Sequence, residues 1–195
     1  IVDDKIRIYF TTRFKDSDHT YISYPSYIEC DMDFELLNIA NHEVLPKGPL
    51  GSYFEHGVFP FSPFKDKDNH ISALISGWSR RKSVPVETAI GLATSLDSGV
   101  SFTAPPGPVL SASHHAPFLV VDGYLRKYNN LYYMWYIYGV RWKETQNGRV
   151  ERVYKISFAT SSDLIHWSPS FQPIIPDVID SDECQALPSV ICYKD

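Results

Sequence analysis

The sequence Ala93-Thr94-Ser95-Leu96-Asp97 returns later in the chain as Ala159-Thr160-Ser161-Ser162-Asp163. Each copy leads through a polar turn to an aromatic residue, Phe102 in the first and Trp167 in the second. A second landmark, a pair of apolar residues, recurs at nearly the same interval, at Val44-Leu45, Val109-Leu110 and Ile174-Ile175. Landmarks that share one interval indicate an internal repeat of about 65 residues.

Each repeat contains four short segments rich in aromatic and β-branched residues, the types that favour strands. In the second repeat these segments lie at 61–64, 71–78, 89–95 and 108–110, and a polar turn near Asp68 separates the first two. Four strands in a repeat of fixed length are typical of one blade of a β-propeller. We therefore predict an all-β fold, a β-propeller of four-stranded blades. The alternative is an ordinary β-sandwich in which the similarity between segments is accidental.

The repeat also predicts the domain organisation. We expect a single β-propeller domain whose blade-like units lie at about 1–50, 51–112 and 113–178, with the start of a further unit at 179–195. Because closed propellers have about 4–8 blades, we expect this sequence to be part of a longer chain. Closure of a ring by self-association is the alternative.

We expect the propeller domain to be incomplete at both ends of this sequence. The chain begins beside a turn at 3–5, inside a first hairpin. Near its end, a strand expected at 189–192 leads to the equivalent turn at 193–195. Glu183 would precede that strand, just as Glu55 precedes the segment at 61–64.

Composition narrows the classes of function. The 195 residues carry a formal net charge of −5, with a pI near 5.8, which argues against nucleic-acid binding. No apolar run is long enough to cross a membrane. Cys30, Cys184 and Cys192 lack CxxC spacing, so we expect reduced thiols and a cytoplasmic rather than secreted protein. Scattered histidines and the lack of a Gly-rich phosphate loop predict neither a metal nor a cofactor. The sequence predicts no oligomeric state.

The candidate catalytic residues are acids expected on one face of the propeller. Aligned on the hairpin turns, Glu55, His115 and Glu183 occupy equivalent positions at the starts of first strands, and Asp122 lies farther along its strand. Two carboxylates across a funnel suit glycosidic bond cleavage, because one donates a proton while the other acts as base or nucleophile. The alternative is that these are solvated loop acids and that Asp122, before Gly123, is a turn residue.

Two loops between second and third strands combine Trp with Arg on the same expected face. The first contains Trp78, Arg80 and Arg81, and the second contains Arg141 and Trp142. Trp offers a flat apolar platform for a sugar ring, and Arg a forked donor for hydroxyls, carboxylates or phosphates. Trp packing between blades, with Arg at the rim, is the alternative. We predict that these five residues, with His115, bind the substrate.

The sequence resembles the five-bladed β-propeller glycoside hydrolases. The resemblance is carried by Gly57-Val58-Phe59-Pro60, Ser76-Gly77-Trp78, Ala89-Ile90-Gly91-Leu92-Ala93, Tyr133-Met134-Trp135-Tyr136 and the segment from Glu183 to Val190. This superfamily includes the arabinanase/xylosidase, invertase and levansucrase groups and the mannoside phosphorylases. Within it, the sequence more closely resembles a bacterial glycosidase-like branch.

The resemblance implies roles for three acids. Hydrolases of the superfamily use an Asp at the start of the first blade, a second Asp in a middle blade and a Glu as general acid in a later blade. Glu183 matches the Glu, Asp122 would be the second Asp that orients it or sets its pKa, and Glu55 is the reserve acid. The first Asp would precede Ile1. Where related chains tend to have Asp-Pro, this sequence has Ala116-Pro117.

The expected function is therefore that of a glycoside hydrolase-like propeller, an O-glycosyl hydrolase that cleaves a glycosidic bond by paired carboxylates. Its expected partner is an oligosaccharide or glycoside substrate. Three alternatives stay open: a non-catalytic carbohydrate-binding propeller, a glycoside phosphorylase whose Arg and His hold inorganic phosphate, and a protein-interaction scaffold. The missing Asp-Pro favours the first of these.

Overall fold

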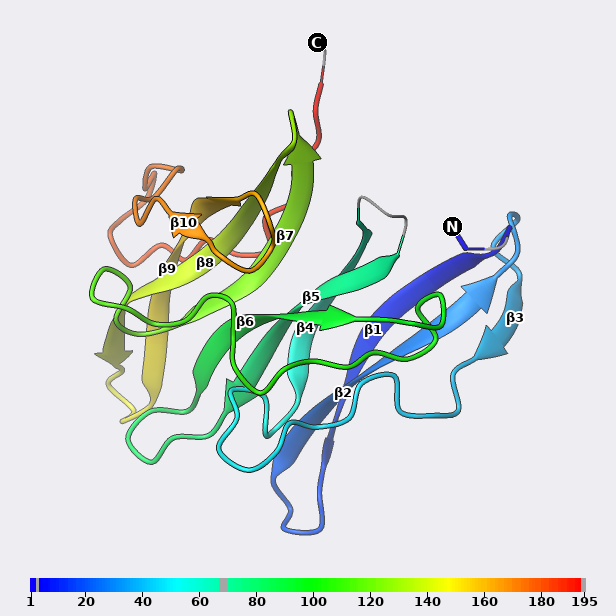
Figure 1. Cartoon of the computed structure of the whole chain (residues 1–195). Helices are drawn as coiled ribbons and strands as arrows, with labels where there is room; N and C mark the ends of the chain where they lie inside the picture. Colours follow the sequence, from blue (N-terminus) through cyan, green and yellow to red (C-terminus); the bar gives the residue numbers. More distant parts are fainter. Residues whose placement is uncertain (3, 67–69, 194–195) are drawn as a thin grey trace.

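The computed structural model describes residues 1–2, 4–66 and 70–193. In this part of the chain the fold is all β, with three antiparallel sheets and no helix (Figure 1). The strands are β1 Ile6–Lys15, β2 Tyr21–Cys30, β3 Leu36–Ile39, β4 Val58–Lys65, β5 Ile71–Ser79, β6 Glu87–Thr94, β7 Val120–Tyr128, β8 Leu131–Glu144, β9 Val150–Ser161 and β10 Ser168–Pro169. The sheet orders are β1-β2-β3, β4-β5-β6 and β7-β8-β9-β10. The predicted β-propeller fold class is confirmed.

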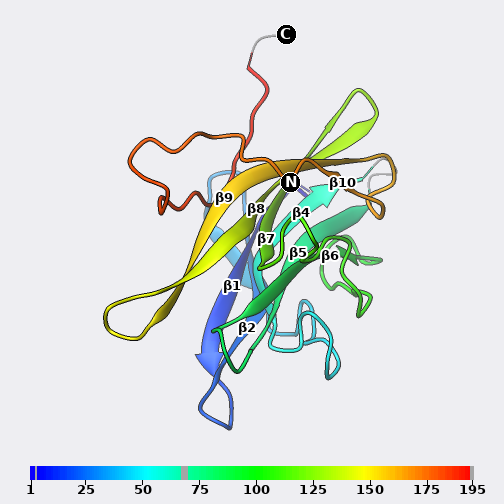
Figure 2. The same ribbon diagram turned by 90° about the vertical axis from the view of Figure 1, so that its left-hand side faces the viewer.

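The three sheets stack on one another in sequence order, because β4 contacts β1 and β2 on one side and β7 on the other. Seen from the side, their strands cross at an angle (Figure 2), as expected for twisted sheets packed face to face. The middle sheet is therefore covered on both faces by the described residues.

Strand β5 shows this arrangement in its sequence. Its residues are buried from Ile71 to Trp78 without alternation. Ile75 packs into a core cluster shared with Tyr27 of the first sheet, whereas Leu74 packs into a cluster shared with Met134 and other residues of the third sheet. Full burial of one such aliphatic side chain contributes about 1.5–3 kcal/mol, so the two clusters hold the stack together.

The outer sheets bury one face only. In β1, alternate residues Ile8, Phe10 and Phe14 point away from the middle sheet and are 39–47% exposed. On the far side of β8, the rings of Tyr133 and Trp135 stack with centroids 6.0 Å apart and are half-buried. The stack thus ends on an apolar face at both of its outer sheets.

The repeated Ser-x-Asp sequence is structural. After β6, the Ser95 hydroxyl donates to the Asp97 carboxylate at 2.7 Å, and Asp97 accepts the Ser101 backbone N–H at 2.9 Å. After β9, the Ser161 hydroxyl donates to the Asp163 carboxylate at 3.1 Å. Both copies fold the chain back after the third strand of a blade, which explains why the sequence recurs.

The fourth-strand positions are less regular than predicted. In the first sheet the edge strand β3 ends at Ile39, before the Val44-Leu45 landmark of the repeat, although Leu45 itself is buried. In the second sheet the edge is reduced to isolated bridges, one of them between Ile90 and Leu110. Around 173–175, the Ile174 N–H donates to the Ile156 carbonyl outside β10.

No strand forms at 189–192, where one was expected. A strand needs a neighbour for its backbone N–H and C=O groups, and no described strand forms a ladder with this segment. The Val190 carbonyl instead accepts a hydrogen bond from a side chain, that of Arg126, whose Nε lies at 3.1 Å. The expected turns near residues 3, 68 and 194 include positions outside the described residues.

Candidate functional site

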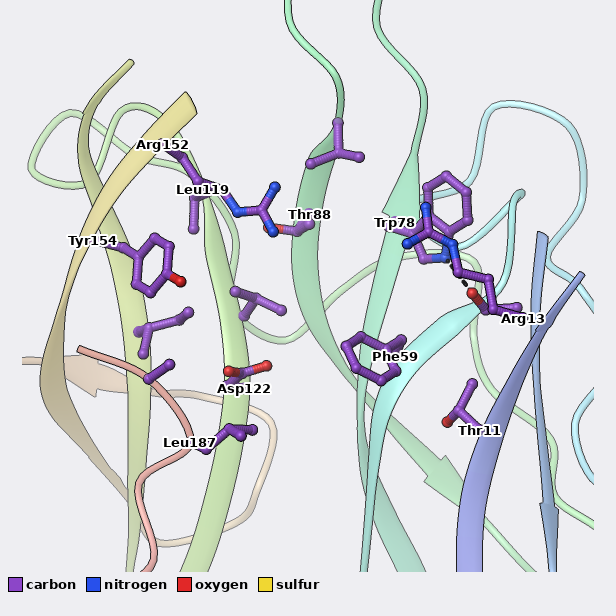
Figure 3. A pocket seen from close by; sticks show the side chains of 15 residues that line it. Thr11, Arg13, Phe59, Trp78, Thr88, Leu119, Asp122, Arg152, Tyr154 and Leu187 are labelled. Atoms are coloured by element: carbon purple, nitrogen blue, oxygen red, sulfur yellow. Dashed lines mark hydrogen bonds between the residues drawn. The ribbon is translucent and has the colours of Figure 1, made fainter. Parts of the chain in front are cut away.

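A cleft of about 350 Å³ opens where the three sheets meet (Figure 3). Its walls come from β1, β2, β4 to β9 and the segment that contains Ala186 and Leu187. A close approach of two sheets supports it: Ser23 and Gly57 form a parallel bridge. Gly57 has φ +107°, and a Cβ there would meet the Ser23 carbonyl oxygen at 1.8 Å, so only glycine fits.

The cleft is built from equivalent positions of the repeat. Ser23, Thr88 and Tyr154 line it from β2, β6 and β9, and each follows the one before it by one repeat. Arg13 and Trp78 line it from β1 and β5 and are likewise separated by one repeat. The blades therefore converge on one cavity, as the propeller prediction requires.

Asp122 reaches the cleft through an irregularity in β7. The pairing of β7 with β8 shifts register between Val121 and Tyr124, and Asp122 has φ +60°. Asp tolerates this left-handed region better than most residues, and β-bulges often re-aim a side chain near active sites. The Asp122 N–H, freed from the ladder, donates to the buried Ser76 hydroxyl at 2.9 Å. The Asp122 side chain then lines the cleft (Figure 3), and its catalytic role stays a prediction.

Burial sets the protonation of Asp122. Removal of water from around the carboxyl raises its pKa, while a hydrogen bond from the Leu187 N–H and the charge of Arg152 lower it; the net shift is upward. A carboxyl group with a raised pKa keeps its proton to higher pH, which a general acid requires. Leu187, with φ +51°, belongs to the segment that follows Glu183.

Trp78 packs between two sheets and also lines the cleft. The ring is 7% exposed and its Nε1 donates to the Ser23 hydroxyl at 3.2 Å. His56 packs against it at 5.5 Å between ring centroids, and the Arg13 guanidinium lies 5.4 Å from its centre. Trp78 is therefore a structural residue of the first two sheets and a part of the cleft wall.

Glu55 and Glu183 each bind their own loop. Glu55 Oε2 accepts the Gly51 N–H at 2.7 Å. Glu183 Oε2 accepts two backbone N–H groups, from Val178 at 3.0 Å and from Ile179 at 2.9 Å. Neither acid is among the residues that line the cleft. The repeat thus gives both acids the same local role, and their catalytic assignment stays a prediction.

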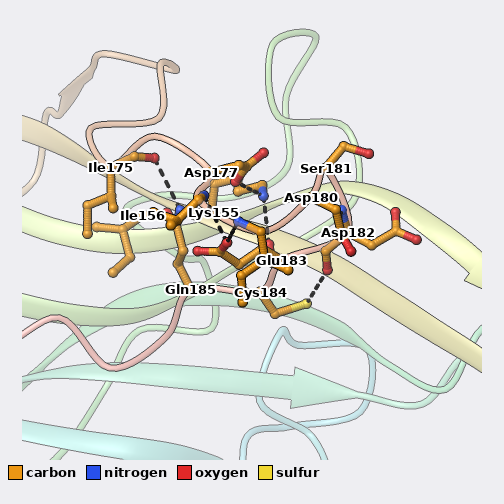
Figure 4. A network of polar contacts seen from close by, with 12 residues as sticks. Lys155, Ile156, Ile175, Asp177, Asp180, Ser181, Asp182, Glu183, Cys184 and Gln185 are labelled. Atoms are coloured by element: carbon orange, nitrogen blue, oxygen red, sulfur yellow. Dashed lines mark hydrogen bonds and ion pairs between the residues drawn. The ribbon is translucent and has the colours of Figure 1, made fainter.

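A buried lysine anchors the Glu183 loop to β9 (Figure 4). Lys155 is 5% exposed and its Nζ binds the Asp177 carboxylate and, at 2.6 Å, the Glu183 carbonyl. Gln185 adds two bonds: its Oε1 accepts the Ile156 N–H at 3.2 Å, and its Nε2 donates to Ile175 O at 3.1 Å. This network fixes the segment that delivers Leu187 to Asp122.

Three arginines predicted to bind substrate form hydrogen bonds or ion pairs with protein groups outside the cleft. Arg80 donates to the Tyr21 carbonyl. Arg81 Nε donates to the Glu87 carboxylate at 2.7 Å, and Arg141 pairs with a carboxylate in the Glu183 loop. None of the three lines the cleft.

The other two predicted binding residues also lie outside the lining. His115 packs between His114 and Phe171, with ring centroids 5.0 Å from each. Trp142, half-buried, is the cross-strand partner of Arg152. A substrate role for these five residues and for Trp78 remains a prediction, and Trp78 alone among the six lines the cleft.

Sequence reasoning missed Arg13, Arg152 and Tyr154. The repeat was the signal that could have found them: Arg13 precedes Trp78 by one repeat, and Tyr154 follows Thr88 by one repeat. Arg152 stands in the same relation to Val86, and both line the cleft.

The described residues contain no group of three or more His, Cys, Asp or Glu side chains able to hold a metal ion. Nor does this part of the chain contain a helix long and apolar enough to span a membrane.

Solved structures with a similar fold are glycoside-acting enzymes. A xylan β-1,4-xylosidase from Bacillus halodurans C-125 matches 89% of this chain over 29% of its own, at 15% identity and TM-score 0.59. A sucrose-6-phosphate hydrolase from Lactobacillus gasseri matches 86% over 31% of its own, at 15% identity and TM-score 0.60. An α-L-arabinofuranosidase from Lactobacillus brevis matches 88% over 52% of its own, at 16% identity and TM-score 0.57.

These matches confirm the sequence-based resemblance at the level of fold. They are β-propellers of the five-bladed glycoside hydrolase type, and at this low identity the likeness shows the fold alone. The chain spans about half the length, or less, of the solved chains it matches. No family model matches the sequence, and no curated protein matches it.

Proposed function

We propose that the protein acts on a glycosidic bond and that its cleft binds an oligosaccharide or glycoside. The observation that carries the proposal is the half-buried Asp122, whose carboxyl lies in a cleft that Trp78 and Tyr154 also line. Aromatic rings suit the apolar faces of sugars. The fold shared with a xylosidase, an arabinofuranosidase and a sucrose-6-phosphate hydrolase supports this chemistry.

In this proposal Asp122 donates the proton to the leaving oxygen as the glycosidic bond breaks, and the oxygen of a water molecule forms the new bond to the anomeric carbon. Glycosidic cleavage uses a pair of carboxyl groups, of which the acid is the one with a raised pKa. Among the described residues that line the cleft, Asp122 is the carboxylic acid. Glu183 acts indirectly: its carboxylate shapes the loop that leads to Leu187, whose N–H bonds Asp122.

A non-catalytic carbohydrate-binding propeller is the second candidate. The observation that favours it is that Glu55 and Glu183 bind backbone N–H groups of their own loops instead of facing the cleft. A cleft with one carboxyl group can bind a saccharide without cleaving it.

The test is a screen of aryl-glycosides with the wild type and with Asp122→Asn, Glu183→Gln and Glu55→Gln, each with and without inorganic phosphate. We expect Asp122→Asn to lower turnover at least about 100-fold, the usual contribution of a general acid. The two Gln variants keep an acceptor oxygen for the loop and should stay within about threefold.

A loss for Glu183→Gln as large as that for Asp122→Asn would contradict this assignment and restore Glu183 as the acid. Saccharide binding without turnover would favour the binding propeller. Turnover that needs phosphate would identify a phosphorylase.

A further inference from the structure

The cleft carries more positive than negative side chains, although the chain as a whole is acidic. Arg13 and Arg152 both line it, and Asp122 is the one carboxylic acid among its described lining residues. The net charge of the chain is −5. A cleft whose charge opposes that of the surrounding protein favours a ligand of the complementary sign.

Within the part of the chain that the structure describes, neither cleft arginine forms an ion pair with a carboxylate. Arg7, Arg81 and Arg141 each pair with a carboxylate. Within the described residues, Arg13 and Arg152 have no carboxylate at ion-pair distance. Both side chains are exposed, so their guanidinium groups stand where the cleft meets solvent. Their hydrogen-bond donors are available to a ligand.

Aromatic rings hold the Arg13 guanidinium in place. It lies 4.9 Å from the centre of the Tyr21 ring and 5.4 Å from that of Trp78. Such stacking fixes the plane of a guanidinium group while its edge donors remain free for bidentate binding of an oxyanion. Arg152 lies across the cleft from it (Figure 3).

A buried hydroxyl without a partner lies in the same cleft. Thr88 is 9% exposed, lines the cleft, and its Oγ1 has no hydrogen-bond partner in the described part of the chain. The Arg152 side chain extends toward it in Figure 3. Buried polar groups are almost always hydrogen-bonded, so this hydroxyl is suited to bind an oxygen of a ligand.

We propose that the cleft recognises an acidic saccharide, one that carries a carboxylate or a phosphate, through Arg13 and Arg152 on opposite walls and the Thr88 hydroxyl between them. The inference rests on the proposed function, because it names the class of saccharide that the cleft takes. Charge-assisted bonds from arginine to a carboxylate or phosphate are stronger than neutral ones.

Calorimetric titration with matched ligands tests the inference. The probes are uronic-acid oligosaccharides with their carboxyl-reduced neutral counterparts, sugar phosphates with the corresponding free sugars, and inorganic phosphate alone. We expect an acidic member to bind about tenfold more tightly than its neutral counterpart, with a smaller difference at high salt.

The variants Arg13→Gln and Arg152→Gln should each lower affinity for the acidic member about fivefold, whereas the Lys variants retain part of it. Arg149→Gln makes the same charge change outside the cleft and should leave both affinities unchanged. Thermal unfolding of each variant verifies that it is folded.

The outcomes separate the two proposals. Equal affinity for acidic and neutral saccharides would overturn the acidic specificity and leave the proposed function standing. Binding of no saccharide at all would overturn both. Inorganic phosphate bound as tightly as the sugar phosphate would show a site for free phosphate and overturn the acidic-saccharide inference.

Discussion

Asp122 and Glu183 are acids from neighbouring units of one repeat, yet the chain uses them in different ways. Asp122 lies on a strand whose register is broken, so its half-buried carboxyl lines the cleft. Glu183 lies in a loop, and its carboxylate is occupied by two backbone N–H groups. The difference shows that repeat position alone does not assign a catalytic acid; the local backbone decides where the carboxyl points.

The loop of Glu183 depends most on Lys155. Replacement by Met keeps the volume but leaves Asp177 and the Glu183 carbonyl without their buried cation. We expect a loss of about 2 kcal/mol in the free energy of unfolding, as for other hydrogen bonds to charged groups, measured by urea denaturation. Lys143→Met removes an exposed lysine paired with Asp182 and serves as the control. Equal effects of the two variants would contradict the anchoring role of Lys155.

The cleft position of Asp122 depends on Ser76. Ser76→Ala removes the hydroxyl that accepts the Asp122 N–H, so that a backbone donor at the bulge loses its partner. We expect a cost of about 1–2 kcal/mol in the free energy of unfolding together with weaker saccharide binding. Ser52→Ala is the matched control, because the Ser52 hydroxyl is buried without a partner in the described residues. If saccharide binding is unchanged in Ser76→Ala, the hydrogen bond from Asp122 to Ser76 is not needed to place Asp122 in the binding site.

The two loop acids should behave alike. Glu183→Ala and Glu55→Ala each remove an acceptor of backbone N–H groups, at a cost of about 1 kcal/mol. Glu183→Gln keeps an acceptor oxygen and should recover most of that loss in urea denaturation. A Gln variant as unstable as the Ala variant would mean that the charge, and not the hydrogen bonds, holds the loop.

The smallest expected effect is the pH dependence from Asp122. Its pKa in the folded protein is raised, so the folded state holds the proton more tightly than the unfolded state, whose Asp pKa is about 3.9. Below that pH both states are protonated and the stability is fully present; it is lost as pH rises through the folded pKa. Asp122→Asn should therefore be more stable than the wild type at pH 7, with a difference that shrinks toward pH 4. A constant difference between the two pH values would contradict the raised pKa.

The repeat predicted the fold class, because the turn and strand residues that form each sheet recur at a fixed interval. Asp122 lines the cleft, where the bulge in β7 turns it, and its catalytic role stays a prediction. The strand expected at 189–192 did not form, because a strand depends on a neighbour that apolar content alone cannot specify.

Other features of the site required coordinates. Arg13 and Arg152 occupy ordinary strand positions, and their one-repeat spacing from Trp78 and Val86 points to the cleft only once Trp78 and Val86 are known to line it. The N–H groups that occupy Glu55 and Glu183 come from residues four or five positions earlier, in loops whose path has no periodic pattern. The bulge that turns Asp122 inward depends on Ser76, which lies far earlier in the chain, on β5.

The most direct test is the titration of the Asp122 carboxyl by carbon NMR, with Asp122→Asn to assign the signal. A proton donor that is partly shielded from water should titrate with a pKa above the ordinary value of 3.8. Addition of a bound neutral saccharide should raise this pKa further, because it displaces water from around the carboxyl. A midpoint at or below 3.8, unmoved by saccharide, would contradict the assignment of Asp122 as the acid of the cleft.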